Sequence, residues 1–334
     1  MKTDTEHKVL EYIEQNKQAT AFELVNYLNI SRQAVFKQLK KLNLQNKLVK
    51  IGKPPKVYYI LATNIGEWFQ EARGNTTNVQ LSEEQKRIID NNYLYVSSFG
   101  HIYKGMDGFV HWCVNTKQPI EKTAIEYIKT LKKYAAYRNK DGLLDGMKKM
   151  KNSFKTVYLD SVFYLDFYSI ERFGKTKLGK MLLYAKQSQN KTLIKQLTLE
   201  IKPQVQKIIL QYNIDGVGFI PPTIKREVQL MSVLAKQLDI KQEIISINKV
   251  INDVAVPQKT LTKIDERITN ARNTIYVTER KKFENILLID DAVGSGATLN
   301  ETAKKIRAQN LCTGKIIGLA LTGSYKGFDV ISEV

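Results

Sequence analysis

Apolar side chains recur at helical spacing in three short runs over the first 62 residues. The runs extend from Val9 to Ile13, from Phe22 to Leu28 and from Val35 to Leu42, and a period of three to four residues is typical of helices. Thr20 and Ser31 stand directly before the second and third runs, where hydroxyl side chains cap helix N-termini. The pattern therefore predicts three consecutive helices.

Two short apolar runs follow the third predicted helix. They extend from Leu48 to Ile51 and from Val57 to Ile60 and flank Gly52-Lys-Pro-Pro55, which predicts a hairpin with a basic tip. Three helices followed by a hairpin is the order of a winged helix-turn-helix module. Residues 1–62 resemble that bacterial family, with Ser31 to Lys41 in the place of its recognition helix.

Basic residues concentrate in this third helix and hairpin, because residues 31–60 contain eight lysines and arginines and no acid. A helix laid in the major groove reaches base edges and phosphates, so the resemblance implies a duplex DNA partner. The alternative is a basic module for protein contact, in a homodimer or with a nucleoprotein partner. The nucleic-acid-binding residues implied are Ser31, Arg32, Gln33, Lys37, Lys40, Lys41, Lys53 and Lys56.

Residues 63–150 carry a weaker pattern, predicted to be a linker and an α+β insert. Ser82 and Gln85 are spaced as a capping box for a short helix through Ile89. Strand patterns are predicted at 93–96 and 109–112, around a turn with two glycines. A helix is predicted from about 120 to 137, with Ile125, Ile128, Leu131 and Ala135 on one face.

Helix and strand patterns alternate in the last domain, predicted over 151–334, after an aromatic strand pattern at 158–168. Alternation predicts an α/β domain with a parallel sheet, whose ligands bind at the carboxyl ends of the strands. Helices are predicted at 175–187, 191–211, 224–238 and 297–309, and strands at 214–220, 242–249, 286–290 and 315–321.

Composition narrows the choice of partners. The formal net charge is +19, from 52 basic and 33 acidic residues, which favours nucleic acid, a phosphorylated metabolite or both over a membrane surface. No apolar run reaches the roughly 20 residues of a spanning helix, and the N-terminus lacks the apolar core of a signal peptide. We expect a cytoplasmic protein without a membrane partner, in which Cys113 and Cys312 are unpaired core residues.

The strongest chemical signal is the stretch from Asn285 to Leu299. Four apolar residues, Ile286 to Ile289, predict a buried strand that leads through Asp290 and Asp291 into a glycine-containing loop and a helix. Such a loop directs backbone N–H groups and the positive end of the helix dipole at an anion. The sequence therefore predicts a phosphate site, with the two acids free for another part of the ligand, such as sugar hydroxyls.

Two acids, a glycine turn and a hydroxyl at this spacing resemble the signature of type I phosphoribosyltransferases, which bind 5-phosphoribosyl-1-diphosphate (PRPP). The resemblance implies that Asp290 and Asp291 meet the ribose hydroxyls, directly or through water on a magnesium ion that also bridges the diphosphate. It implies that the following loop holds the 5-phosphate. The loop residues are Gly294, Ser295, Gly296, Ala297 and Thr298.

The order of pieces over about residues 165–325 is similar to the ComF type of phosphoribosyltransferase. Residues 219–231 resemble its diphosphate-binding turn, with Thr223, Lys225 and Arg226 on the diphosphate. Residues 258–270 resemble its flexible loop, with Lys259, Lys263, Arg267 and Asn270 able to close over the site. With Asp290 and Asp291, Lys259 and Arg267 form the predicted catalytic set.

The chain departs from that type in two respects. A winged helix stands in place of the usual cysteine-rich zinc ribbon, and no acceptor-binding residues are recognisable, although residues 93–115 could supply a hood by their position. The segment Gly174 to Lys180 has the spacing of a P-loop, but Met181 stands where magnesium needs a hydroxyl. We interpret it as the start of an amphipathic helix.

Winged helix plus phosphoribosyltransferase-like domain also resembles bacterial purine repressors, whose second domain senses PRPP and does not catalyse. The first hypothesis is therefore a DNA-binding regulator that responds to PRPP or a nucleotide. The alternative is an active magnesium-dependent phosphoribosyltransferase tethered to nucleic acid, including an effector of an anti-phage or toxin-like system. Fold alone does not separate these hypotheses.

Overall fold

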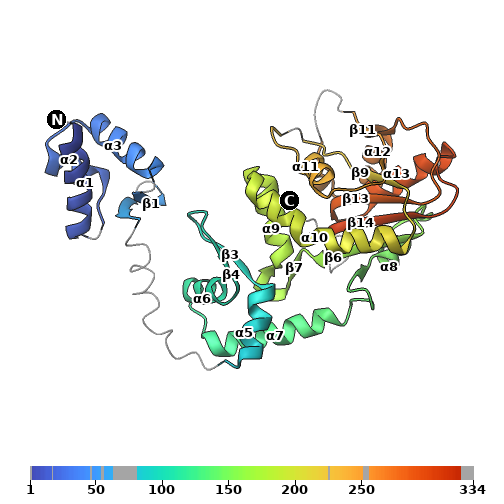
Figure 1. Ribbon diagram of the computed structural model, residues 1–334, viewed down its shortest axis with the longest axis horizontal. Helices are drawn as coiled ribbons and strands as arrows, with labels where there is room; N and C mark the ends of the chain where they lie inside the picture. The colour runs from blue at the N-terminus through green and yellow to red at the C-terminus, as the bar shows by residue number, and fades with distance from the viewer. Residues whose placement is uncertain are drawn as a thin grey trace. The chain divides into compact units, whose positions relative to one another are not determined.

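The computed structural model describes residues 2–16, 18–45, 47–53, 56–62, 81–224, 226–250 and 256–324 (Figure 1). The chain divides into two compact units. The first comprises Met1–Asp90 and Tyr95–Ala124, and the second comprises Asn91–Leu94 and Ile125–Val334. The predicted boundaries after residues 62 and 150 stay predictions.

Three helices and a hairpin begin the first unit, in the predicted order. They are α1 (Lys2–Asn16), α2 (Ala21–Leu28), α3 (Arg32–Leu44), β1 (Leu48–Lys53) and β2 (Lys56–Leu61), and the two strands pair antiparallel. Thr20 forms a capping box with Glu23 at the start of α2, and the Ser31 hydroxyl accepts from the Ala34 N–H at the start of α3. Both caps confirm the predicted helix starts.

The core of this N-terminal module is built from the predicted apolar runs. Val9, Ile13, Leu24, Val35 and Leu39 are fully or almost fully buried in one cluster. Burial of each such side chain stabilises the fold by about 1.5 to 3 kcal/mol. The exposed faces of the helices carry polar and basic residues together with Phe22, Tyr27, Phe36 and Leu44. The identification of this module as a winged helix stays a prediction.

The elements between residues 81 and 115 are α5 (Glu83–Asn92), β3 (Leu94–Val96), β4 (Ile102–Lys104) and α6 (Gly105–Asn115), and Asn91–Leu94 among them belongs to the second unit. The Ser82 and Gln85 side chains each accept from the other's backbone N–H, as predicted. The predicted strand at 109–112 is wrong, because these residues lie in α6. Phe109 and Cys113 are buried one helical turn apart, a period that the short apolar run concealed.

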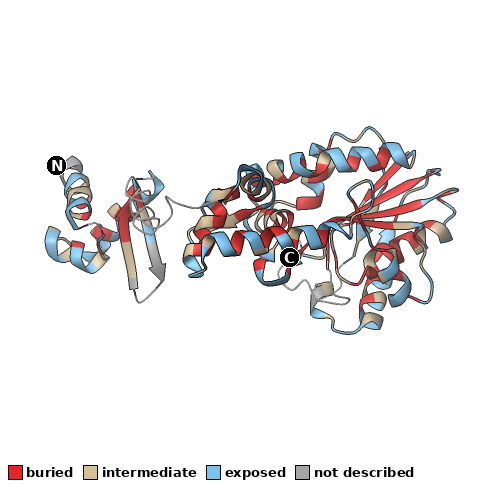
Figure 2. Ribbon diagram, turned by 90° about the horizontal axis from the view of Figure 1, so that it is seen from below, coloured by how far each residue is buried: buried red, intermediate tan, exposed pale blue. Residues whose placement is uncertain are grey.

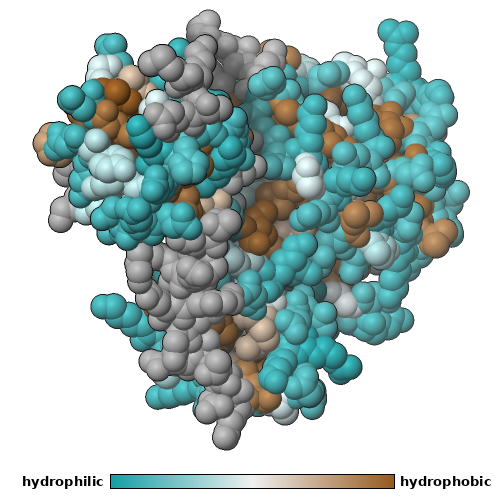
Figure 3. Space-filling model, turned by 60° about the vertical axis from the view of Figure 1, so that its left-hand side comes forward, coloured by the Kyte–Doolittle hydropathy of each residue, from teal (hydrophilic) through white to brown (hydrophobic). Residues whose placement is uncertain are grey.

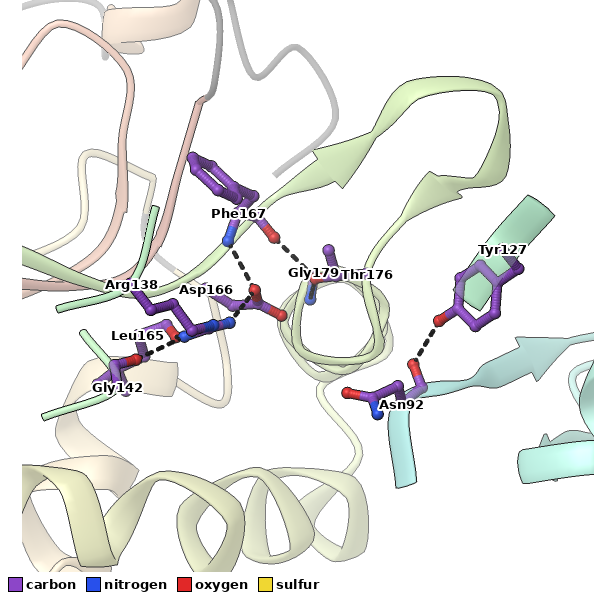
Figure 4. Close-up of polar contacts among 9 residues, drawn as sticks. All are labelled: Asn92, Tyr127, Arg138, Gly142, Leu165, Asp166, Phe167, Thr176 and Gly179. Carbon is purple, nitrogen blue, oxygen red and sulfur yellow. Dashed lines mark hydrogen bonds and ion pairs between the residues drawn. The ribbon is translucent and has the colours of Figure 1, made fainter. Parts of the chain in front are cut away.

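Helix α7 (Ile120–Ala135) confirms the predicted helix and one residue of its predicted buried face, Ile128. Ile125 is 55% exposed and Ala135 is exposed, whereas Tyr127, Ile128 and Tyr134 are buried. Two tyrosines define the buried face because their rings pack inside while a hydroxyl finds a partner. The Tyr127 hydroxyl donates to the Asn92 carbonyl at 2.9 Å (Figure 4).

The second unit is organised around a six-stranded sheet in the order β10-β9-β13-β14-β6-β5. All neighbouring strands are parallel except β5 and β6. The strands are β10 (Glu243–Ile244), β9 (Gly216–Phe219), β13 (Ile286–Val293), β14 (Ile316–Gly323), β6 (Ser161–Phe167) and β5 (Leu144–Asp145). Figure 2 shows the central strands buried, as near-continuous apolar runs require. The predicted α/β parallel sheet is confirmed.

Helices accompany this sheet, and two pairs of short strands stand outside it. The helices are α8 (Met147–Ser153), α9 (Lys177–Ser188), α10 (Lys191–Gln211), α11 (Leu230–Gln237), α12 (Ile264–Thr274) and α13 (Ala297–Ala308). The strand pairs are β7 (Ser169–Ile170) with β8 (Gly174–Lys175), and β11 (Ile247–Lys249) with β12 (Ile275–Val277). Residues Glu171–Phe173 and Gln258–Thr260 form 3₁₀ turns.

Three predicted elements of this unit differ from the structure. The helix predicted at 224–238 begins only at Leu230, because the segment after Pro221 and Pro222 runs as a loop whose Val228 N–H donates to Gln189. The strand predicted at 242–249 splits into β10 and β11, and β11 pairs with β12. Strand β13 continues to Val293 instead of ending at residue 290.

The segment with P-loop spacing begins a helix, as interpreted from the sequence. The Thr176 hydroxyl accepts from the Gly179 N–H at 3.0 Å and donates to the Phe167 carbonyl at 2.7 Å (Figure 4). This N-cap occupies the place of a phosphate cradle, so residues 174–180 position α9 against β6. On the face drawn in Figure 3, hydrophilic side chains predominate and apolar ones form small patches.

Candidate functional site

The loop between β13 and α13 is shaped around Gly296. Its φ is +84°, in the left-handed region that favours glycine, and a Cβ at this position would overlap the Met150 sulfur. The Ser295 side chain is buried, and its hydroxyl accepts from the Ala297 N–H at 3.3 Å. The loop therefore brings residues 294–298 to the N-terminus of α13, which is a favourable place for an anion.

This loop forms one wall of a cavity of about 170 Å³. The cavity brings together most of the predicted PRPP residues: Thr223, Arg226, Arg267, Asp290, Asp291 and the loop 294–298. Lys225 lies outside the described residues, as does the side chain of Lys259. Lys263 and Asn270 do not line the cavity. The other lining residues are Lys186, Ile220, Pro221, Pro222, Ile224, Lys249, Pro257, Gln258, Ala292 and Val293.

The two acids differ in their surroundings. Burial, together with the neighbouring Asp291 carboxylate, raises the pKa of Asp290 to about 7, although the Asp291 N–H, Lys186 and Lys249 oppose the shift. One Asp290 oxygen accepts from the Asp291 N–H at 2.8 Å. Asp291 instead accepts from the Lys186 ammonium at 2.5 Å. The pair therefore combines a carboxyl that is reluctant to ionise with one that is paired with a lysine ammonium.

Two lysines of this cavity were missed by the sequence reasoning. Lys186 comes from the last turn of α9 and is about 15% exposed, paired with Asp291. It continues the stripe of Leu178 and Leu182 at a spacing of four residues, and a lysine in line with buried leucines was the available signal. The segments with family-like motifs, residues 219–231, 258–270 and 290–298, do not include Lys186.

Lys249 lies in β11 and reaches the opposite side of the cavity. Its ammonium donates to the Thr223 hydroxyl at 2.6 Å, which fixes Thr223 in the predicted diphosphate turn. Burial lowers the pKa of Lys249, the carboxylates of Asp290 and Asp291 act in the opposite direction, and Lys186 adds to the lowering. A desolvated ammonium beside the loop 294–298 is stabilised by an anion in the cavity.

Arg267 places the predicted flexible loop beside the phosphate loop. Its side chain is 4% exposed, and its Nε donates to the Leu261 carbonyl at 2.8 Å. Burial lowers the pKa of this guanidinium. A Cβ on Gly294 would lie 3.6 Å from Arg267 Nη1. Gln258 donates to the Asn270 side chain, so Asn270 serves the packing of this segment.

The donor set agrees with a magnesium ion that a ligand helps to hold. Asp290 and Asp291 are the acids that line the cavity. Among the described residues, no group of three or more histidines, cysteines or acids is placed to hold a metal ion. Magnesium is commonly bound by one or two carboxylates together with phosphate oxygens and water. The two acids fit that role, and the protein offers no complete metal cage in this part.

In the N-terminal module, α3 presents Ser31, Arg32, Gln33, Lys37 and Lys40 to solvent. The Ser31 hydroxyl already caps the helix. Glu6 of α1 forms ion pairs with Lys41, at 2.7 Å, and Lys47, at 2.6 Å. Residues 31–60 contain no acid of their own, and α1 provides the acid that pairs with these two lysines. The side chains of Lys53 and Lys56 lie outside the described residues. Nucleic-acid binding by all of these residues stays a prediction.

Comparison with known families concerns the domain that contains this cavity. Residues 194–330, about two fifths of the chain, match the family model described as phosphoribosyl transferase domain. This match supports a type I phosphoribosyltransferase domain that includes every predicted PRPP residue, whereas Lys186 precedes the matched range. No curated protein matches the chain. Within the described ranges, no helix combines the length and apolar character needed to cross a bilayer.

Proposed function

We propose that this protein binds PRPP or a nucleotide in the cavity at the end of β13 and duplex DNA through its N-terminal module, as a regulator that responds to the ligand. The observation that carries the proposal is the convergence of Asp290, Asp291, the loop 294–298 and four cations on one cavity. The type I phosphoribosyltransferase match over this region agrees with it.

Each part of PRPP has a complementary group in the cavity. The N–H groups of residues 294–298 and the N-terminus of α13 suit the 5-phosphate. Asp290 and Asp291 suit the ribose hydroxyls, which donate hydrogen bonds to carboxylates. Thr223, Lys249 and Arg226 line the other side and suit the diphosphate. Arg267 stands near Gly294, where it adds positive charge to the phosphate loop.

Magnesium would be held by Asp290 and Asp291 together with ligand oxygens. The ion would supply charge neutralisation between the diphosphate and the ribose hydroxyls. The protein's own residues then orient the ligand, because Lys186 fixes the Asp291 carboxylate and Lys249 fixes the Thr223 hydroxyl.

DNA binding is proposed from the exposed face of α3. Arg32, Gln33, Lys37 and Lys40 are exposed at helical spacing on one element, and such a face contacts phosphates and base edges in a groove. Regulation requires that PRPP binds two states of the protein with different affinity. The sign of its effect on DNA affinity is left to measurement.

The first test is ligand-dependent melting of the full chain. We expect PRPP with magnesium to raise the melting temperature, because a ligand at a hundred times its dissociation constant adds about 2.7 kcal/mol. The double variant Asp290→Asn with Asp291→Asn should lose this shift. Glu200→Gln removes an acid of α10 that is paired with Lys177 and does not line the cavity. This control variant should keep the shift. An equal shift in the double variant would exclude the acids from the ligand site.

The second candidate function is catalysis of phosphoribosyl transfer. The observation that favours it is the presence of Lys249 and Arg226 in the cavity, which would stabilise charge on a departing diphosphate. Incubation with PRPP, magnesium and a panel of bases and nucleotides decides between the two candidates. Diphosphate release that depends on one acceptor establishes the enzyme, and PRPP binding without release under any acceptor favours the regulator.

A further inference from the structure

A second cavity, of about 350 Å³, lies in the same unit and shares no residue with the first. Its walls are the aromatic and apolar side chains of Leu144, Tyr164 and Phe167, with Tyr137 beside them. Lys148 and Asn152 of α8 form a polar side. The cavity stands at the carboxyl ends of β6 and β14, the edge of a parallel sheet where ligands bind. Its size is within the range of small-molecule sites.

The aromatic wall is held in place by the polar network drawn in Figure 4. Arg138 binds Asp166 at 2.6 Å and the Leu165 carbonyl at 2.8 Å, which fixes the end of β6. Phe167, the next residue, leaves the strand on the side opposite to Asp166. Its ring meets Tyr137 edge-on, with centroids 6.1 Å apart. The wall is therefore formed before any ligand arrives, which lowers the entropic cost of binding.

The charges at the cavity favour a ligand with one negative group. Lys148 and Lys149 line it, and Asp145 is the acid that lines it. Asp145 accepts from the Met147 N–H at 2.7 Å, at the start of α8, and Lys149 donates to the Ser324 hydroxyl at 2.6 Å. Lys148 is exposed at the rim. Aromatic walls with a net positive rim fit a planar aromatic monoanion.

Helix α8 connects this cavity with the phosphate loop. Lys148, Lys149 and Asn152 line the cavity on one side of the helix. Met150 lies against Gly296 from the other side, and a Cβ on Gly296 would also lie 3.8 Å from Phe154. One short helix therefore touches both sites. A ligand that moves or rigidifies α8 would change the support of the loop 294–298.

We propose that the second cavity is an effector site for a planar aromatic carboxylate, and that its occupancy is coupled through α8 to ligand binding at the phosphate loop. The proposed binding of the carboxylate is inferred only from the second cavity and does not depend on PRPP binding. The coupling rests on the proposed PRPP function.

Titration of the full chain with indole-3-carboxylate tests the binding, by calorimetry. Neutral indole should bind at least about tenfold more weakly if the rim charge contributes about 1.4 kcal/mol. Asn152→Trp fills the cavity from an exposed position and should abolish binding. No heat with millimolar indole-3-carboxylate, or unchanged binding in Asn152→Trp, would overturn the site.

A pair of charge reversals on α8 supplies a matched control. Lys148→Glu should weaken binding of indole-3-carboxylate by about tenfold, a loss of about 1.4 kcal/mol. Lys151→Glu makes the same change on an exposed residue of the same helix that does not line the cavity, and it should leave the affinity unchanged. Equal losses in the two variants would reject a specific role of the rim.

Coupling is measured as the change in PRPP affinity at saturating indole-3-carboxylate, and linkage requires the same factor in the reverse titration. Asp290→Asn with Asp291→Asn should remove PRPP binding and retain the aromatic ligand, which separates failure of the proposed function from failure of this site. Unchanged PRPP affinity would overturn the coupling. Consumption of the probe together with PRPP would make it an acceptor and overturn the effector assignment.

Discussion

The N-terminal module and the cavity at the end of β13 use positive charge in opposite ways. On α3, Arg32, Lys37 and Lys40 are exposed to solvent. In the cavity, Arg267 is 4% exposed and the pKa of both Arg267 and Lys249 is lowered by burial. Basic residues are therefore hydrated on the surface of α3 and desolvated in the cavity.

The difference shows what each cation can recognise. An exposed cation is screened by salt and contributes mainly through release of counterions from a polyanion. A buried cation costs free energy unless an anion is near, so its position is fixed by its partner. Lys186 has such a partner in Asp291. Lys249 donates to the neutral Thr223 hydroxyl, and the nearby anions are the carboxylates of Asp290 and Asp291. Net charge alone could not distinguish these two uses.

The largest expected effect concerns the exposed cations and salt. If α3 and the hairpin make roughly six phosphate contacts, duplex DNA affinity should fall about a thousandfold between about 50 and 200 mM salt. Arg32→Glu with Lys37→Glu should abolish binding in a fluorescence anisotropy titration. Lys191→Glu with Lys195→Glu changes the same charge at exposed positions of α10 and should retain binding. Unchanged affinity in the α3 variant would remove the DNA-binding proposal.

The next effect tests whether the buried site is preformed. Gly296→Ala forces a side chain into left-handed backbone and against Met150, so we expect a loss of about 2 to 4 kcal/mol in the free energy of unfolding. Gly294→Ala meets only Arg267 Nη1, at 3.6 Å, and should change stability by less than about 0.5 kcal/mol. Urea unfolding measures both, and equal losses would contradict the assigned roles of the two glycines.

A smaller effect is expected for the ion pair of the buried site. Lys186→Met should lower the free energy of unfolding by about 1 to 3 kcal/mol, because it leaves Asp291 without the donor 2.5 Å away. Asp291→Asn should have a similar cost, and the double variant should cost less than the sum of the two. A double-mutant cycle by urea unfolding measures this coupling. Additive losses would mean that the pair does not interact in solution.

The sequence predicted those features whose cause is local. The loop after β13 is one continuous segment, in which the apolar strand, Asp290, Asp291 and the glycines follow in order, so its geometry could be read from spacing. The caps at Thr20 and Ser31 are local in the same sense and are confirmed. The alternation of helix and strand patterns predicted a parallel sheet. It did not predict which strands are neighbours in that sheet.

Features that depend on tertiary contact were missed. Lys186 reaches Asp291 across 105 positions of the chain, and Glu6 reaches Lys41 and Lys47 from α1. Neither pairing leaves a local signal beyond one lysine in an apolar stripe. The strand predicted at 109–112 failed for a related reason. A short, mostly apolar run such as Phe109-Val-His-Trp112 fits either a strand or one turn of a helix, and burial of Phe109 and Cys113 one turn apart accompanies the helix of Gly105 to Asn115.

The smallest expected effect is on the exposed side of the comparison and depends on pH. Hydrogen bonds from Lys41 and Lys47 lower the pKa of Glu6 from 4.5 to about 2. A carboxyl with a lowered folded-state pKa stabilises the fold above its ordinary pKa, and this contribution is lost as the pH falls from about 4.5 through about 2. Because Glu6 lies at the surface, the effect on stability should be small.

A titration of the Glu6 carboxyl by nuclear magnetic resonance should give a midpoint near 2 in the wild type. Lys41→Met with Lys47→Met should move the midpoint toward 4.5, whereas Lys40→Met, which changes a lysine of the same helix outside this cluster, should leave it in place. A wild-type midpoint near 4.5 would show that both lysines are free in solution, and Lys41 would then join the exposed cations available to DNA.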